Sequence, residues 1–140
     1  MKEFRLSILA PDEEMYEGPC ESVVVPASDG QYGIMANHTN MISGLIPGML
    51  TYQIPGGERR ILAVSYGLVK VENNEVLVIV DDAERPEEID EKRAQRDADA
   101  AKEKMLQERS LRDYRMAQAD LARAMNRLKL RRGYEKDLLN

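Results

Sequence analysis

Apolar and polar positions alternate along the first part of the chain, the pattern of β-strands that are buried on one face. Phe4, Leu6 and Ile8 follow this period. Short runs rich in Val, Ile and Leu predict further strands at 21–25, where Pro26 is expected to stop the strand, and at 61–66, 68–71 and 76–80. Turn residues separate the runs at 28–30, 47–48, 55–57 and 73–74, and Asn73-Asn74 predicts a hairpin. This spacing is typical of an all-β sandwich or barrel.

The period of the pattern becomes helical after Pro86. Small or apolar side chains recur along one face of a first helix, at Ala94, Ala98, Ala101 and Met105. A second stripe predicts a second helix, with members Leu111, Tyr114, Ala117, Leu121, Met125 and Leu128. Ser110 is the expected N-cap of that helix, so the two helices form a hairpin that turns near 107–110.

Charged residues predict where these helices begin and end. The first turn of the first helix is expected to hold the acidic residues Glu87, Glu88, Asp90 and Glu91. The last turn of the second is expected to hold the basic residues Lys129, Arg131 and Arg132. Gly133 is the expected C-cap, which gives helices of roughly 18 and 22 residues.

The predicted fold class is α+β. A β-sandwich or barrel, residues 1–86, is followed by an antiparallel two-helix hairpin, residues 87–140. Alanine buries little apolar area, so the hairpin is expected to be marginally stable and able to detach from the sandwich. The alternative is that the small residues only permit close helix packing.

Charge is unevenly distributed over the 140 residues. The net charge of −5 divides into −7 over residues 1–86 and +2 over residues 87–140, and the segment 111–132 alone carries +5. Partner recognition through charge is therefore expected in the last part of the chain. Binding of nucleic acid by the basic second helix is a weaker alternative, because aromatic residues make up 5% of the chain and Trp is absent.

Few residues are available for catalysis or metal binding. A single Cys20 excludes an internal disulfide and a cysteine zinc site, and a single His38 excludes a histidine-rich metal site. We expect no catalytic residues, no metal and an intracellular, soluble protein, since no apolar run approaches the ~20 residues of a membrane span and the N-terminus lacks an apolar signal core.

Several short motifs, taken in order and spacing, resemble the epsilon subunit of the F-type rotary ATP synthase, bacterial type. The resemblance covers essentially the whole chain, and its markers are residues 21–26, 29–34, 38, 45–48, 88–94 and 123–128. The sequence departs from the family pattern at Ala27, at Met35-Ala36-Asn37 and at Tyr66-Gly67. These departures concern loop details.

The resemblance implies that residues 1–86 form a β-sandwich of about ten short strands. It also implies a non-catalytic central-stalk subunit that couples ion-driven rotation to ATP synthesis and regulates ATP hydrolysis. Its implied partners are the gamma (shaft) subunit, the membrane rotor ring of c subunits and the catalytic alpha/beta hexamer, without nucleic acid and without membrane insertion. The implied location is peripheral, at the cytoplasmic face of the cell membrane. Whether the coupling ion is H⁺ or Na⁺ stays open.

Residues 29–40 are expected to form a loop that, by the resemblance, contacts the rotor ring through Gln31 and His38. Glycine in this polar loop permits close approach to another backbone. The alternative from the residues alone is an ordinary surface turn with a solvated histidine.

By the resemblance, the hairpin also binds a regulatory Mg-ATP, although no cofactor is required. The implied residues are Glu84, Ile89, Asp90, Arg93, Ala94, Arg123 and Arg127, with the adenine near Ile89 and Ala94. Arg123 and Arg127 lie four positions apart on one helix face and can present two guanidinium groups to phosphates. A further basic residue expected near position 100 is missing, with Lys102 as the nearest substitute. Alternatively, these arginines are solvated or pair with carboxylates.

The basic segment 111–132 is implied to meet an acidic segment of the catalytic subunit when the hairpin opens and extends along the shaft. The alternative is a permanently folded hairpin with a solvated basic face. A rival function for the whole chain is a free-standing nucleotide sensor in which only the hairpin matters.

Overall fold

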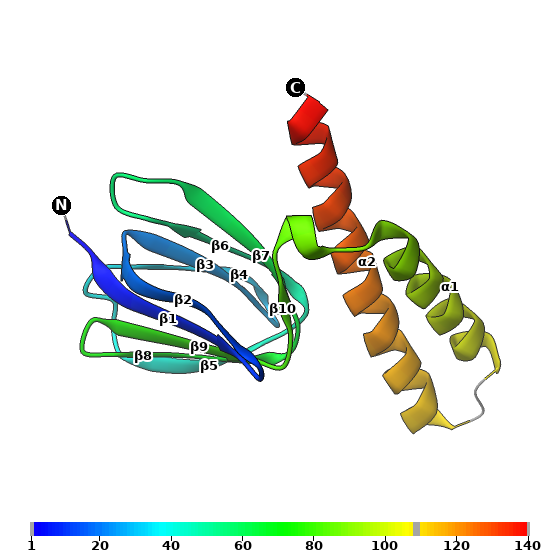
Figure 1. The fold of residues 1–140 in the computed structure, drawn as a ribbon. Helices are drawn as coiled ribbons and strands as arrows, with labels where there is room; N and C mark the ends of the chain where they lie inside the picture. The colour runs from blue at the N-terminus through cyan, green and yellow to red at the C-terminus, as the bar shows by residue number, and fades with distance from the viewer. Residues whose placement is uncertain (1, 108–109, 140) are drawn as a thin grey trace. The chain divides into compact units, whose positions relative to one another are not determined.

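The computed structural model describes residues 2–107 and 110–139, with side chains described as far as 136. The chain divides into two compact units, Met1–Glu84 and Arg85–Asn140 (Figure 1). The first unit is built of strands and the second of helices, which confirms the predicted α+β class.

The described part of the first unit contains ten strands, as expected. They are β1 (Phe4–Ala10), β2 (Glu13–Cys20), β3 (Ser22–Ala27), β4 (Gly30–Met35), β5 (Met41–Leu45), β6 (Gly48–Gln53), β7 (Arg59–Val64), β8 (Gly67–Glu72), β9 (Glu75–Val80) and β10 (Ala83–Glu84). They form one continuous sheet in the order β10-β7-β6-β3-β5-β8-β9-β1-β2, with β4 paired to β3. β1 and β9 are parallel, and the other pairings are antiparallel.

The core of this unit lies on the inner face of the sheet. Alternate residues of β1, β3, β6, β8 and β9 are almost completely buried, beginning with Leu6 and Ile8 of β1. The other strands contribute the same kind of branched side chain, including Val23, Val25, Leu50, Leu62, Val69, Val71, Val76, Val78 and Val80. The period-2 pattern of the sequence therefore predicted correctly that Phe4, Leu6 and Ile8 face the core.

Two local expectations in this unit are wrong. β3 does not stop before Pro26 but continues to Ala27, because Pro26 needs no N–H of its own: it lies opposite Gln31 of β4, and its carbonyl accepts a hydrogen bond from the Ile46 N–H at 3.1 Å. Residues 29–40 are not one loop, since half of them form β4, Asp29 lies in the turn before it and another turn begins after Met35. The Asn73-Asn74 hairpin is confirmed, and both residues have positive φ, 50° and 62°.

The second unit is a helical hairpin. A short 3₁₀ turn, η1 (Pro86–Glu88), precedes α1 (Glu91–Gln107) and α2 (Leu111–Leu139). The core between the two long helices consists of Ala94 and Ala98 of α1 with Ala124 and Leu128 of α2, and Leu121 packs against them. Ala101 and Ala117 are also buried. The alanine face of α1 is therefore confirmed.

The apolar stripe predicted for α2 is only partly buried. Leu111, Tyr114 and Met125 are 64%, 37% and 44% exposed. They lie on the same helix as Ala117, Ala124 and Leu128, but the small residue Ala124 rather than Met125 faces α1. The prediction chose the larger apolar residues, whereas close helix packing selected the smaller one.

The predicted helix ends also need correction. Glu87 and Glu88 lie in or at η1, Asp90 precedes α1, and of the acidic set only Glu91 lies in the first turn of α1. α2 continues through Lys129, Arg131, Arg132 and Gly133 to Leu139, so Gly133 is not its C-cap and the helix has 29 residues. Ser110 caps α2 as predicted, because its Oγ accepts the Asp113 N–H at 3.1 Å. Residues 108–109 of the expected turn lie outside the described residues.

Candidate functional site

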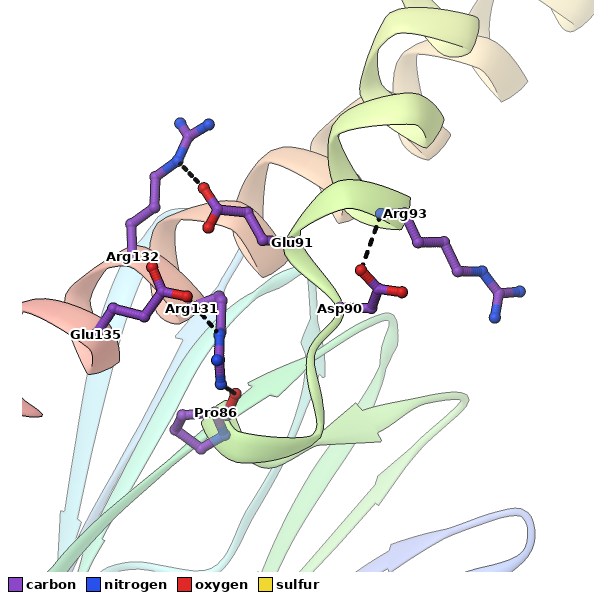
Figure 2. Close-up of polar contacts among 7 residues, drawn as sticks. All are labelled: Pro86, Asp90, Glu91, Arg93, Arg131, Arg132 and Glu135. Atoms are coloured by element: carbon purple, nitrogen blue, oxygen red, sulfur yellow. Dashed lines mark hydrogen bonds and ion pairs between the residues drawn. The ribbon is translucent and has the colours of Figure 1, made fainter.

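The segment expected to bind nucleotide begins α1. The Asp90 carboxylate accepts a hydrogen bond from the Arg93 N–H at 3.2 Å, and the Asp90 carbonyl accepts the Ala94 N–H at 2.9 Å, so Asp90 is the N-cap (Figure 2). Ile89 and Ala94 are 3% and 0% exposed. The structure thus brings these four residues together, but the side chains expected near an adenine are buried and present no open surface.

Arg93 has an exposed side chain. Its guanidinium points away from Asp90, and no described residue offers it an acceptor or an ion-pair partner (Figure 2). Within the described hairpin, Arg93 is therefore available to an anion without displacing a carboxylate.

Arg123 and Arg127 lie on α2, as predicted, and both contact carboxylates. Arg123 Nη1 donates to Asp120 Oδ1 at 3.1 Å on its own helix. Arg127 Nη1 donates to Asp97 Oδ2 of α1 at 3.3 Å, and its side chain is only 19% exposed. A phosphate would have to replace these carboxylates, so the alternative of paired arginines describes the structure as it stands.

Two further residues were expected at the nucleotide site from the sequence. Glu84 is the last residue of β10 in the first unit, where it pairs with Ala63 of β7. Lys102, the substitute for the missing basic residue, is exposed on α1 beside the buried Ala101. Neither Ala100 nor Ala101 can supply the missing charge.

The sequence analysis missed a polar cluster at the start of α1, which we call the arginine clasp. Arg132 Nε donates to Glu91 Oε1 at 2.8 Å, and Arg132 Nη2 donates to Gln95 Oε1 at 3.0 Å. Arg131 Nη1 donates to the carbonyl oxygen of Pro86 at 3.3 Å (Figure 2). The clasp comprises Arg131, Arg132, Pro86, Glu91 and Gln95.

Electrostatics within the clasp favour the ionised state of its carboxylate. The hydrogen bond from Arg132 lowers the pKa of Glu91 below its ordinary value, more than burial raises it. Arg131 is held from its own helix as well, by Glu135 Oε1 at 3.0 Å and by the Tyr134 ring 5.4 Å away. The sequence did hold a signal for this cluster. The first turn of α1 holds the acidic Glu91, and the antiparallel α2 carries the basic pair Arg131 and Arg132 late in its sequence.

Gln31 and His38, the expected rotor-ring residues, belong to β4 and to the turn after it. Gln31 is exposed opposite Pro26. His38 is half-buried: Nε2 lies 3.2 Å from the Tyr32 hydroxyl, Nδ1 lies 2.7 Å from the Thr39 carbonyl, and its ring meets the Tyr32 ring edge-on. His38 is therefore held in place rather than simply solvated.

An apolar surface across β5, β8 and β9 was not anticipated. Ile42, Leu68 and Ile79 are 71%, 39% and 43% exposed. Leu68 lies directly opposite Ile79, and Lys70 lies beside Leu68 along β8, opposite Ile42. We call Ile42, Leu68 and Ile79 the outer apolar face. Its sequence signal was that β9 is apolar at consecutive positions, which requires cover on both sides of the strand.

Comparison with protein families accounts for both units. Residues 3–86 match the model of the ATP synthase delta/epsilon chain beta-sandwich domain, and residues 87–130 match that of the ATP synthase delta/epsilon chain long alpha-helix domain. The chain belongs to the ATP synthase delta/epsilon chain family.

Individual relatives narrow this to the bacterial epsilon type. The ATP synthase epsilon chain of Caldicellulosiruptor saccharolyticus is 36% identical over 93% of this chain and 94% of the relative. That of Clostridium novyi is 33% identical over 92% of this chain and 98% of the relative. The resemblance drawn from the motifs is thereby confirmed, and with it a non-catalytic subunit rather than an enzyme.

Solved structures of the family share the fold at low identity. A chain of the Euglena gracilis mitochondrial ATP synthase matches with a TM-score of 0.76 and 22% identity, over 87% of this chain and 77% of that chain. A chain of the Tetrahymena thermophila mitochondrial ATP synthase central stalk and c-ring matches with a TM-score of 0.69 and 15% identity, over 94% and 99%. Neither described helix of the present chain is long and apolar enough to cross a membrane.

Proposed function

We propose that this chain is the central-stalk rotor subunit of an ion-driven ATP synthase, seated on the cytoplasmic face of the cell membrane. Its sandwich binds the shaft subunit and the membrane ring of c subunits, and the chain turns with them. Family membership supports this role, and the outer apolar face is the observation that carries it. The alternative function, a free-standing nucleotide sensor, does not explain why that face is exposed and apolar.

The shaft contact is assigned to the outer apolar face. Ile42 of β5 is 71% exposed and lies opposite Lys70, two residues from Leu68 along β8. Contiguous large apolar side chains on a surface indicate a protein interface. Cover by a partner would also explain why β9 is apolar on both faces.

A charge placed on this face tests the shaft contact. Ile42→Glu is expected to reduce retention of the shaft subunit in co-purification by about ten-fold, because a carboxylate would be buried among apolar groups. Arg59→Glu, at an exposed position of β7, is the matched control and is expected to retain it. Undiminished retention with a folded Ile42→Glu sandwich would contradict the assignment.

The ring contact is assigned to Gln31 and His38. The tyrosine, carbonyl and ring contacts of His38 give this part of the unit a defined shape for recognition. Cysteine at position 31 is expected to crosslink to the polar loop of a c subunit that carries an engineered cysteine. Cysteine at position 58 is the control, because the turn at 54–58 follows β6 at the Ser22 end of β3, whereas Gln31 lies opposite Pro26 at the other end. Equal crosslinking at both positions would overturn the contact.

We assign regulation to the hairpin, through binding of Mg-ATP. The residues proposed for this site are Asp90, Arg93, Arg123 and Arg127, together with Glu84, Ile89 and Ala94. The exposed Arg93 guanidinium supports anion binding. The carboxylate contacts of Arg123 and Arg127 oppose it, so we expect weak binding. Calorimetric titration of the full chain with Mg-ATP is expected to show saturable heat that Arg93→Gln reduces; no heat and no thermal shift at millimolar Mg-ATP would exclude the site.

An extended hairpin would carry the basic segment 111–132 to an acidic segment of the catalytic hexamer. At ~1.5 Å per residue, α1 and α2 placed end to end would reach roughly 70 Å. Binding of either ligand shifts the balance between folded and extended states only by its difference in affinity for the two. The folded state must therefore be held by contacts of limited strength.

A further inference from the structure

We propose that the arginine clasp is the device that keeps α1 paired with α2. The clasp is a property of the isolated chain and goes beyond the proposed function, because it would operate whether or not the chain turns within a motor. Its two arginines are adjacent on α2, yet one holds the segment before α1 and the other holds the first two turns of α1.

The apolar side chains that α1 contributes to the helix pair are small. In the part of α1 that the structure describes, the buried side chains are Ala94, Ala98 and Ala101. Each methyl group removes little apolar area from water, and the stabilisation scales with that area. Polar contacts between the helices therefore add to the burial of Leu121 and Leu128 of α2 in resisting their separation.

The position of the clasp gives it control over separation. The end of α1 and the start of α2 are close together along the chain, so the helices can part first only at the opposite end of the pair, where Glu91 and Arg132 meet. Another polar contact between the helices, from Arg127 to Asp97, lies more than one helical turn further toward Ser110. Opening must release Arg132 before it reaches that contact.

The two arginines hold different kinds of acceptor. Arg131 is a quarter exposed, is fixed by Glu135 and Tyr134, and donates to a backbone carbonyl that no substitution can remove. Arg132 and Glu91 are 56% and 34% exposed, so salt screens their attraction. The clasp should therefore have one salt-sensitive and one less sensitive contact, whereas the alanine interface should not be weakened by salt.

Amide hydrogen exchange of α1 in the full-length chain measures the effect across the helix pair. Arg132→Gln is expected to accelerate exchange of the α1 amides about two- to five-fold at low salt, as loss of an exposed ion pair predicts. Combined with Arg131→Gln, the acceleration is expected to exceed that of either single change. The readout lies on the other helix, so altered helix propensity in α2 does not produce it.

Lys129→Gln is the matched control, because Lys129 is an exposed cation of α2 outside the clasp. It is expected to leave the exchange of the α1 amides unchanged. All of these variants are expected to leave the exchange of the β8 and β9 amides unchanged. The double variant of Glu91→Gln and Arg132→Gln should lose less protection of the α1 amides than the two single variants lose in sum. In 1 M salt, the acceleration of α1 exchange by Arg132→Gln should be smaller. Unchanged α1 exchange in the double arginine variant, or equal acceleration by Lys129→Gln, would overturn the proposal.

Discussion

Gly67 begins β8 at a point where the sheet leaves no room for a side chain. A Cβ at this position would overlap the carbonyl oxygen of Ile79 and crowd the Cα of Val80. These neighbours are backbone atoms of the paired strand β9, so they cannot turn aside as the end of a flexible side chain would. The close approach of β8 and β9 thus depends on one absent methyl group.

We expect Gly67→Ala to lower the free energy of unfolding of the sandwich by about 2–3 kcal/mol, the upper range for overpacking. Urea unfolding of the full chain measures this free energy when the signal comes from core residues of the first unit. Gly33→Ala is the control, since a Cβ at Gly33 meets nothing within 4 Å. An equal cost at both positions would refute the steric argument.

Glu91 gives the hairpin a dependence on pH. Its pKa is lowered by the Arg132 hydrogen bond, and Arg131 and Glu135 also face it. A carboxylate with a lowered pKa contributes stability that is complete above its ordinary value of 4.5 and is lost as the pH falls through the lowered value.

At pH 7, therefore, α1 amides of the unmodified chain are expected to be better protected from exchange than those of Glu91→Gln, after correction for intrinsic rates. This advantage should disappear on acidification below the ordinary carboxyl range, where Glu91 is neutral. Persistence of the full advantage at pH 2 would show that the charge of Glu91 is irrelevant.

At the scale of elements, α2 passes through Gly133 where the sequence favoured an end. Glycine in a helix costs about 1 kcal/mol relative to alanine. The contact from Arg131 to Glu135 spans the glycine one turn apart, and the Tyr134 ring lies near the same guanidinium. These contacts offset part of the free-energy cost of the glycine, and α2 continues to Leu139.

Gly133→Ala separates the two interpretations of this residue. A Cβ here meets nothing within 4 Å and the glycine has no positive φ, so we expect α2 to gain roughly 0.5–1 kcal/mol. Slower amide exchange at 131–136 would record the gain. Faster exchange in Gly133→Ala would mean that the residue ends the helix after all.

Some of these elements follow from the sequence and others do not. Alternation predicts β1, a run of Val, Ile and Leu predicts β9, and Ser110 predicts the start of α2, because these signals act within a few residues of their effect. The start of α1 was missed because acidic residues outside a helix look like those in its first turn, although Asp90 is itself a good N-cap. Local pattern cannot show that Arg132 meets Glu91, 41 positions away, or that Ile79 faces outward while Val78 is buried.

At the scale of the whole molecule, the acidic strand unit and the basic-leaning helical unit differ in what they can bind. The first carries the outer apolar face, and the second carries the +5 segment and the clasp. The proposed function assigns assembly to the first and regulation to the second. Removing the second should therefore separate these two tasks.

The most direct test of this account is the ATP hydrolysis rate of the assembled ATP synthase with the full chain and with a chain lacking residues 87–140. We predict that the shortened chain still co-purifies with the shaft subunit and that hydrolysis rises about five-fold or more, the lower range of allosteric coupling. An unchanged hydrolysis rate in a fully assembled complex would contradict regulation by the hairpin, and loss of assembly would contradict the division of tasks.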